Sequence, residues 1–128
     1  MKSILISEGD DHVARLFATV FSRNDWIVRS LDDAAKAAEV LRGNETFDVV
    51  VVSYKIRGMS GVELTKLIRS LDHRKDTPVV MVTGRPGVEP EALDAGADEV
   101  LSKPVDIYML LEAVTGYASR ARHQDISG

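Results

Sequence analysis

The chain has 128 residues and a formal net charge of −4, is 45% hydrophobic and 28% charged, and contains no cysteine. This length fits one domain, and the acidic balance gives no electrostatic reason to expect direct binding to nucleic acid. The absence of cysteine excludes disulfides and thiolate metal sites and fits a reducing compartment. Met1-Lys2 leads straight into Ile4–Ile6, too short for a signal peptide or membrane span, so we expect a cytoplasmic protein without membrane contact.

Short apolar runs alternate along the chain with longer segments of helical period. This alternation is typical of an α/β domain whose parallel sheet is covered on both faces. The expected strands cover residues 3–7, 26–30, 48–53, 78–83 and 99–101. Five strands and five helices in alternation predict a doubly wound, flavodoxin-like (βα)5 three-layer sandwich with a five-stranded parallel sheet in the order 2-1-3-4-5.

The first two helices are predicted from caps and apolar spacing. The first covers 11–23, where apolar residues recur at i, i+3, i+4, i+7 and i+8 behind a cap at Asp10 or Asp11. The second covers 33–42 and is stopped by Gly43-Asn44.

The third helix is expected to start near Ser60. The fourth is short, because the prolines and glycine of 85–90 interrupt any earlier start. We expect it to begin with Pro90 in its first turn and to end at Gly96.

The last helix is expected to run from about Asp106 toward Arg120. The domain would then cover residues 1–121, and residues 122–128 would form a short polar tail. In doubly wound sheets the chemistry lies beyond the carboxyl ends of the strands. The residues expected there are Ser7 to Asp11, Ser53 to Lys55, Thr83-Gly84 and Ser102 to Pro104.

The segment from Asp48 to Gly61 resembles the third strand and following loop of the receiver domains of two-component response regulators. Gly58 and Gly61 stand five and eight residues beyond Ser53, the strand-ending position. Thr83 and Lys103 stand thirty and fifty residues beyond it, and both are spacings that the family shows. The string Ala95 to Pro104 is similar to the family's signature around its fifth strand, and the resemblance runs from Ile4 to about Ala118.

The resemblance implies a phosphorylation site in which paired acids and a phosphate-accepting aspartate hold Mg²⁺. The metal and a lysine neutralise the transferring phosphoryl group, and a threonine contacts it. Here Glu8 matches the first acid, Gly9 stands at the second, and Ser53 occupies the acceptor position. We therefore expect a degenerate phosphoacceptor position and weak or absent Mg²⁺ binding, with no other cofactor. A seryl hydroxyl is moreover a poor nucleophile unless a base activates it.

Several pocket residues have more than one interpretation. A bulge after the first strand could bring Asp10 to a metal, although a capping role is simpler. Lys103 could serve a phosphate or simply pair with Glu8. Val100 stands at the switch position, where receivers usually carry Tyr or Phe, so the relay from site to surface is expected to be lost. The resemblance also allows a cis peptide before Pro104.

The leading hypothesis is therefore an atypical receiver domain, not an enzyme, that binds a protein partner independently of phosphorylation. The resemblance implies docking on the face made by the fourth helix, fifth strand and fifth helix, with a histidine kinase or another two-component protein as the partner. One alternative is a working receiver with a repaired phosphorylation or metal site. The other is a flavodoxin-like ligand-binding protein or small enzyme, although the loop after the first strand lacks glycines or hydroxyls to cradle a phosphate.

Overall fold

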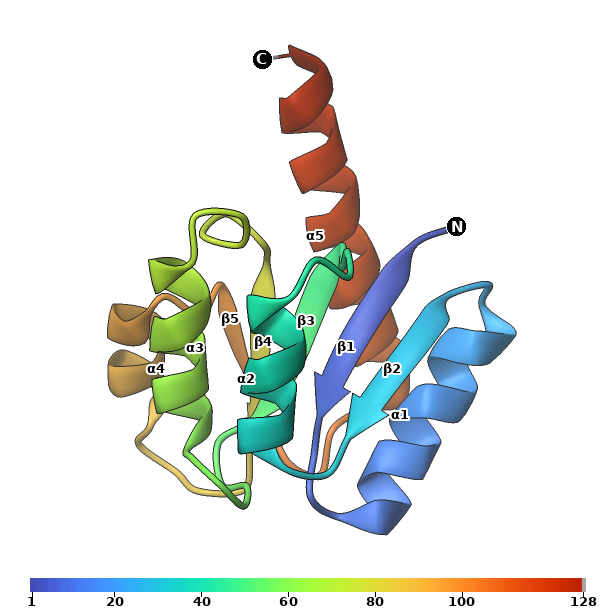
Figure 1. Ribbon diagram of the computed structural model, residues 1–128. Coiled ribbons are helices and arrows are strands. Elements are labelled where there is room, and N and C mark those ends of the chain that lie inside the picture. Colours follow the sequence, from blue (N-terminus) through green and yellow to red (C-terminus); the bar gives the residue numbers. More distant parts are fainter. Residues whose placement is uncertain (128) are drawn as a thin grey trace.

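A five-stranded parallel sheet forms the centre of the molecule. The computed structural model describes the backbone of residues 1–127 and the side chains of residues 1–120. The strands are β1 (Ser3–Ser7), β2 (Ile27–Leu31), β3 (Val49–Ser53), β4 (Val79–Thr83) and β5 (Glu99–Ser102). Their order is β2-β1-β3-β4-β5, with every pair parallel, which confirms the predicted topology (Figure 1).

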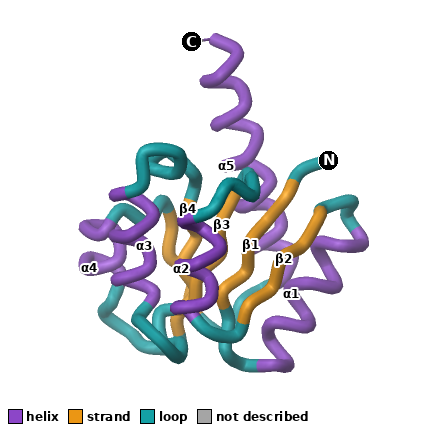
Figure 2. Tube along the Cα trace, viewed as in Figure 1, coloured by secondary structure: helices purple, strands orange, loops and turns teal. Residues whose placement is uncertain are grey.

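Five helices cover the two faces of this sheet, which gives the three predicted layers (Figure 2). They are α1 (Asp11–Arg23), α2 (Ala34–Arg42), α3 (Gly61–Ser70), α4 (Glu89–Ala95) and α5 (Ile107–Ser127). Residues of α2, α3 and α4 share one buried cluster, whereas residues of α1 and α5 share the other.

Side-chain caps begin the first three helices, and Asp10 is one of the two caps predicted for α1. Asp10 Oδ1 accepts hydrogen bonds from the first turn of α1, Asp33 Oδ1 does the same for α2, and Ser60 Oγ caps α3. Helix α4 has no side-chain cap but carries Pro90 in its first turn, as predicted. It ends at Gly96, whose φ of 113° lies in the left-handed region.

Helix α5 is longer than predicted. It continues to Ser127, so the backbone of residues 122–127 is helical where we expected a polar tail, and Gly128 lies outside the described residues. The physical reason is that neither proline nor glycine occurs between Gly116 and Gly128 to stop the helix. In Figure 1 this end of α5 extends well past the sheet.

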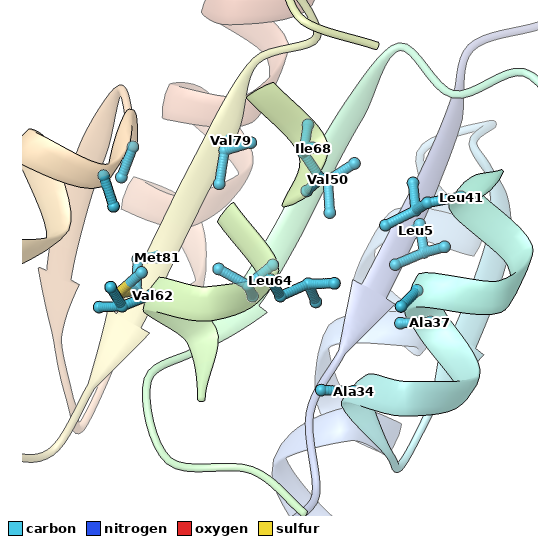
Figure 3. Close-up of a cluster of buried hydrophobic side chains, with 14 of the residues drawn as sticks. Leu5, Ala34, Ala37, Leu41, Val50, Val62, Leu64, Ile68, Val79 and Met81 are labelled. Atoms are coloured by element: carbon cyan, nitrogen blue, oxygen red, sulfur yellow. The ribbon is translucent and has the colours of Figure 1, made fainter. Parts of the chain in front are cut away.

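Strand β3 is buried on both faces because its valines alternate between the two hydrophobic clusters. Val50 and Val52 face α2 and α3, whereas Val49 and Val51 face α1 and α5. Figure 3 shows the first of these clusters, in which Leu64 and other buried side chains of the helices lie against the strands. The rigid sheet fixes the carboxyl ends of its strands, which lie at the lower edge in Figure 1.

Candidate functional site

The carboxyl ends of the strands and the loops after them surround one cleft of about 1210 Å³. Eight of the residues that the sequence places at the strand ends line it: Glu8, Gly9, Asp10, Tyr54, Lys55, Thr83, Gly84 and Lys103. Two others occupy different places. Ser53 is 1% exposed and sits at the end of β3, while Val100 packs into the core on the α4 side of the sheet.

Glu8 and Lys103 form an ion pair that links the ends of two distant strands. Glu8 follows β1, Lys103 follows β5, and Lys103 Nζ lies 2.8 Å from Glu8 Oε1. The side chain of Glu8 is 2% exposed and that of Lys103 is 26% exposed. The second carboxylate oxygen, Oε2, accepts a hydrogen bond of 3.0 Å from the amide of Asp10. The pairing that the sequence left open is thus present, and the buried carboxylate is neutralised.

The hydroxyl of Ser53 lies beside the same ammonium group. Lys103 Nζ donates to Ser53 Oγ at 3.4 Å, and Ser53 Oγ donates to the carbonyl oxygen of Lys55, also at 3.4 Å. Both distances are at the long limit for a hydrogen bond, so both contacts are weak. Neither an ammonium group nor a carbonyl oxygen can take the proton of the hydroxyl. Within the described part of the chain, these contacts leave the Ser53 hydroxyl without an activating base.

Asp10 caps helix α1. Its Oδ1 accepts hydrogen bonds from the amides of His12 at 2.9 Å and Val13 at 3.2 Å. The hydrogen bond from Val13 is the main cause that holds the pKa of this carboxyl below the 3.8 of an ordinary aspartate. The structure therefore gives Asp10 the capping role that the sequence favoured.

The oxygen donors in the cleft do not fit a bound Mg²⁺ of the kind that the resemblance implies. Mg²⁺ demands near-octahedral oxygen ligands at short distance and is usually bound through one or two carboxylates, and the Asp10 carboxylate in this cleft caps α1. The ammonium group of Lys103 already occupies the position beside Glu8, and Gly9 offers no side chain. Among the described residues, no group of three or more His, Cys, Asp or Glu side chains is arranged to hold a metal ion.

The hydroxyl of Thr83 forms its hydrogen bonds within the loop that follows β4. Its Oγ1 accepts a hydrogen bond of 3.0 Å from the amide of Arg85 and donates to the carbonyl oxygen of Arg85 at 3.3 Å. The backbone of Thr83 also holds Lys103, whose amide donates to the Thr83 carbonyl at 2.7 Å. The Lys103-Pro104 peptide is cis, as the resemblance allowed.

Three further basic residues line the cleft: Lys55, which the sequence placed at a strand end, and Arg57 and Arg85, which the sequence reasoning missed. The available signal was positional. Lys55 stands two residues after Ser53 and Arg85 two residues after Thr83, each in a loop that follows a strand end. Isolated exposed cations carry no periodicity, so their gathering became apparent only from the fold.

Comparisons with known proteins agree with this architecture. The family described as response regulator receiver domain matches residues 4–115. Protein PetR of Rhodobacter capsulatus is 31% identical over 119 residues, which are 91% of this chain and 48% of PetR. Hybrid signal transduction histidine kinase A of Dictyostelium discoideum is 24% identical over 118 residues, which are 88% of this chain and 6% of that kinase. The chain thus spans about half or less of these two relatives.

A solved structure gives the same result for the fold. The response regulator receiver domain protein (CheY-like) of Methanospirillum hungatei superposes with a TM-score of 0.89 at 25% identity. The match covers 97% of this chain and 98% of that one. The family match, the sheet order and the cleft at the strand ends lead to one conclusion: this chain belongs to the response regulator receiver domain family.

Proposed function

We propose that this receiver domain acts in two-component signal transduction as a protein-binding module that is not phosphorylated and is not an enzyme. The observation that carries the proposal is the position of Lys103, whose ammonium group contacts both Glu8 and the Ser53 hydroxyl. A phosphoryl group entering there would meet a neutral hydroxyl, where the family has an ionised aspartate. The positive charge that would receive it is already paired with a buried carboxylate.

Weak or absent Mg²⁺ binding is part of the same proposal. Repair of the metal site by Asp10 would require this residue to leave the N-cap of α1 and give up two hydrogen bonds. The proposal also includes the switch position, Val100. A half-buried valine in the core has no ring to change position, so we propose that the family's relay from site to surface is lost.

The proposed docking face consists of α4, β5 and α5, and the proposed partner is a histidine kinase or another two-component protein. Leu93 on α4 is 44% exposed, and Tyr108 and Met109 at the start of α5 are 79% and 59% exposed. Large apolar side chains in such positions are the usual anchors of protein interfaces. The similarity to a hybrid histidine kinase supports this class of partner. We propose no direct contact with nucleic acid or membrane.

A cytoplasmic location accords with this partner class and is proposed with it. The described helices include none with the length and apolar character needed to cross a bilayer.

Intact-mass spectrometry after incubation with acetyl phosphate and Mg²⁺ tests the proposal. We expect the wild-type protein and Ser53→Asp to gain no phosphoryl group, because both lack the second metal-binding acid. The double variant Gly9→Asp/Ser53→Asp should gain one. An ideal Cβ at Gly9 has its nearest neighbours at 3.6 and 3.7 Å, so the cleft has room for that side chain.

The outcomes separate the alternatives. A phosphoryl group on wild-type Ser53 would show that the protein is a working receiver and would overturn the proposal. Uptake by Ser53→Asp alone would show that Asp10 or another donor already completes the metal site.

A further inference from the structure

The cleft is locally basic on an acidic chain. Its lining residues include four cations, Lys55, Arg57, Arg85 and Lys103, and two acids, Glu8 and Asp10. The whole chain carries a net charge of −4. Cations gathered in a concave site concentrate the positive potential there, because the surrounding protein focuses the field. The cleft therefore attracts anions although the molecule as a whole repels them.

Three of these cations are free to bind an anion. Lys103 is paired with Glu8, whereas Lys55, Arg57 and Arg85 are exposed and form no ion pair within the described part of the chain. The acids offset these cations only in part: Glu8 is already paired with Lys103, and the negative charge of Asp10 lies at the positive end of α1.

The free cations come from two different loops. Lys55 and Arg57 lie in the loop between β3 and α3, and Arg85 lies in the loop between β4 and α4. An anion held by both loops would be contacted from two directions, and guanidinium groups form paired hydrogen bonds with phosphate oxygens. The backbone between Thr83 and Arg85 is fixed by the two Thr83 Oγ1 hydrogen bonds, which pre-organises the position of Arg85.

Apolar side chains line the same cleft beside the cations. Tyr54, Ile56 and Met59 follow β3, and Pro86 faces the cleft from the loop after β4. The volume of about 1210 Å³ is far larger than an isolated phosphate group requires. Clefts with apolar walls and a few charged groups are typical of sites that bind small organic molecules.

We propose that this cleft binds a small organic phosphate ester, non-covalently and without Mg²⁺, between the loop of Lys55 and Arg57 and the loop of Arg85. The organic part of the ligand packs on the wall made by Tyr54, Ile56, Met59 and Pro86. The inference rests on the proposed function in one respect, because it treats the cleft as a site where no phosphoryl group is transferred to Ser53. Arg85 lies in the loop that leads into α4, which is part of the proposed docking face.

The test is a ¹H-¹⁵N NMR titration of the wild-type protein with phenyl phosphate, in EDTA and at low ionic strength. We expect saturable shifts at the amides of Lys55, Arg57, Gly84 and Arg85. Inorganic phosphate, which lacks the ring, should bind more weakly at the same amides. The double variant Arg57→Gln/Arg85→Gln should weaken phenyl phosphate binding about tenfold, because exposed charge-assisted contacts contribute modestly.

A matched control removes two positive charges elsewhere. Arg42→Gln/Lys66→Gln alters exposed cations of α2 and α3 that do not line the cleft, and it should bind like the wild type. Equal weakening of binding in both double variants would show that only the net charge of the protein matters, and it would overturn the proposal. Flat spectra with phenyl phosphate would overturn it, and so would a requirement for Mg²⁺ or equal affinity for inorganic phosphate.

Failure here is distinguishable from failure of the proposed function. The NMR titration reports reversible binding, whereas the acetyl phosphate experiment reports a covalent gain of mass, so each result can be positive or negative without the other.

Discussion

Lys103 provides the positive charge beside a buried carboxylate, and this makes the ion pair important for stability. Glu8 is almost fully buried, with Lys103 Nζ at 2.8 Å. Removing one partner of such a pair leaves an uncompensated charge in the protein, which costs more than the pair itself contributes.

We predict that Lys103→Met lowers the free energy of unfolding by about 2–4 kcal/mol, at or below the range for fully buried pairs because water reaches part of the lysine. The double variant Glu8→Gln/Lys103→Met should recover at least half of this loss, since neither charge remains. Urea denaturation at neutral pH, followed by Trp26 fluorescence, measures both. A loss below about 0.5 kcal/mol in Lys103→Met would mean that the charge of Glu8 is compensated without Lys103.

Asp10 links acid pH to the stability of α1. The hydrogen bond from Val13 lowers the pKa of its carboxyl in the folded state, so the folded protein favours the ionised form. The resulting stabilisation is present above the 3.8 of an ordinary aspartate and is lost as the pH falls through the lowered pKa.

We predict that Asp10→Asn reduces the acid dependence of stability, because an asparagine still caps the helix but does not titrate. The difference in urea midpoint between wild type and variant should shrink steadily as the pH is lowered through this range. Asp72→Asn, which alters an exposed acid in the loop after α3, is the control and should keep the wild-type profile. Parallel profiles for wild type and Asp10→Asn would contradict the prediction.

The β3–α3 loop and helix α2 meet at Gly58. This residue has a φ of 97°, and an ideal Cβ there would lie 2.6 Å from Asp33 Oδ1 and 2.8 Å from the amide nitrogen of Ala35. Asp33 caps α2, so a side chain at Gly58 would displace that cap. Gly87, in the β4–α4 loop, has a similar φ of 81° but no atom within 4 Å of an added Cβ.

The two glycines therefore separate backbone strain from a steric clash. We predict that Gly87→Ala costs about 1 kcal/mol from backbone strain alone, whereas Gly58→Ala costs about 2–4 kcal/mol. Urea denaturation of the two variants, side by side, measures the difference. Equal losses would show that the loop yields without disturbing α2.

The elements differ in how well the sequence predicted them. Both ends of helix α1 were predicted correctly, because its N-cap and its apolar stripe lie within one short segment. Strand β2 lies one residue later than predicted, since Trp26 packs edge-on against Phe21 and belongs to the connection. The end of α5 was missed because a polar helix without a stop residue does not differ in pattern from a polar tail.

The candidate site was predicted in part for a similar reason. From their spacing along the chain, Glu8, Thr83 and Lys103 were predicted to lie at the strand ends. The fold places all three in one cleft. Whether Lys103 meets Glu8 or stays free depends on a distance of a few ångströms, which spacing does not determine. Arg57 and Arg85 follow no sequence pattern, so their position beside Lys55 became apparent only from the three-dimensional structure.

At the scale of the whole molecule, one sheet separates two hydrophobic clusters and couples them. Leu64 is fully buried in the cluster with α2, α3 and α4, whereas Trp26, the single tryptophan, is 6% exposed in the cluster with α1 and α5. Strands β1, β3 and β4 contribute side chains to both clusters. Loss of one cluster therefore removes the support of the other.

We predict that Leu64→Ala lowers the free energy of unfolding by about 2–5 kcal/mol and that Trp26 fluorescence reports this loss from the opposite face. Far-UV circular dichroism and fluorescence should give the same urea midpoint, as two-state unfolding requires. An unchanged fluorescence midpoint with a lowered dichroism midpoint would show that the two faces unfold separately.

The strand order also has a consequence for how the chain assembles during synthesis. Strand β1 lies between β2 and β3, so the first three strands made form one uninterrupted sub-sheet. Strand β4 then adds beside β3, and β5 beside β4, each at the open edge left by the strand before it. After β2 has paired on one edge of β1, a chain emerging from the ribosome can add β3, β4 and β5 in turn on the other side without separating strands that have already paired. Lys103 is reached only after the last strand, so Glu8 acquires its counter-ion at the end of this sequence.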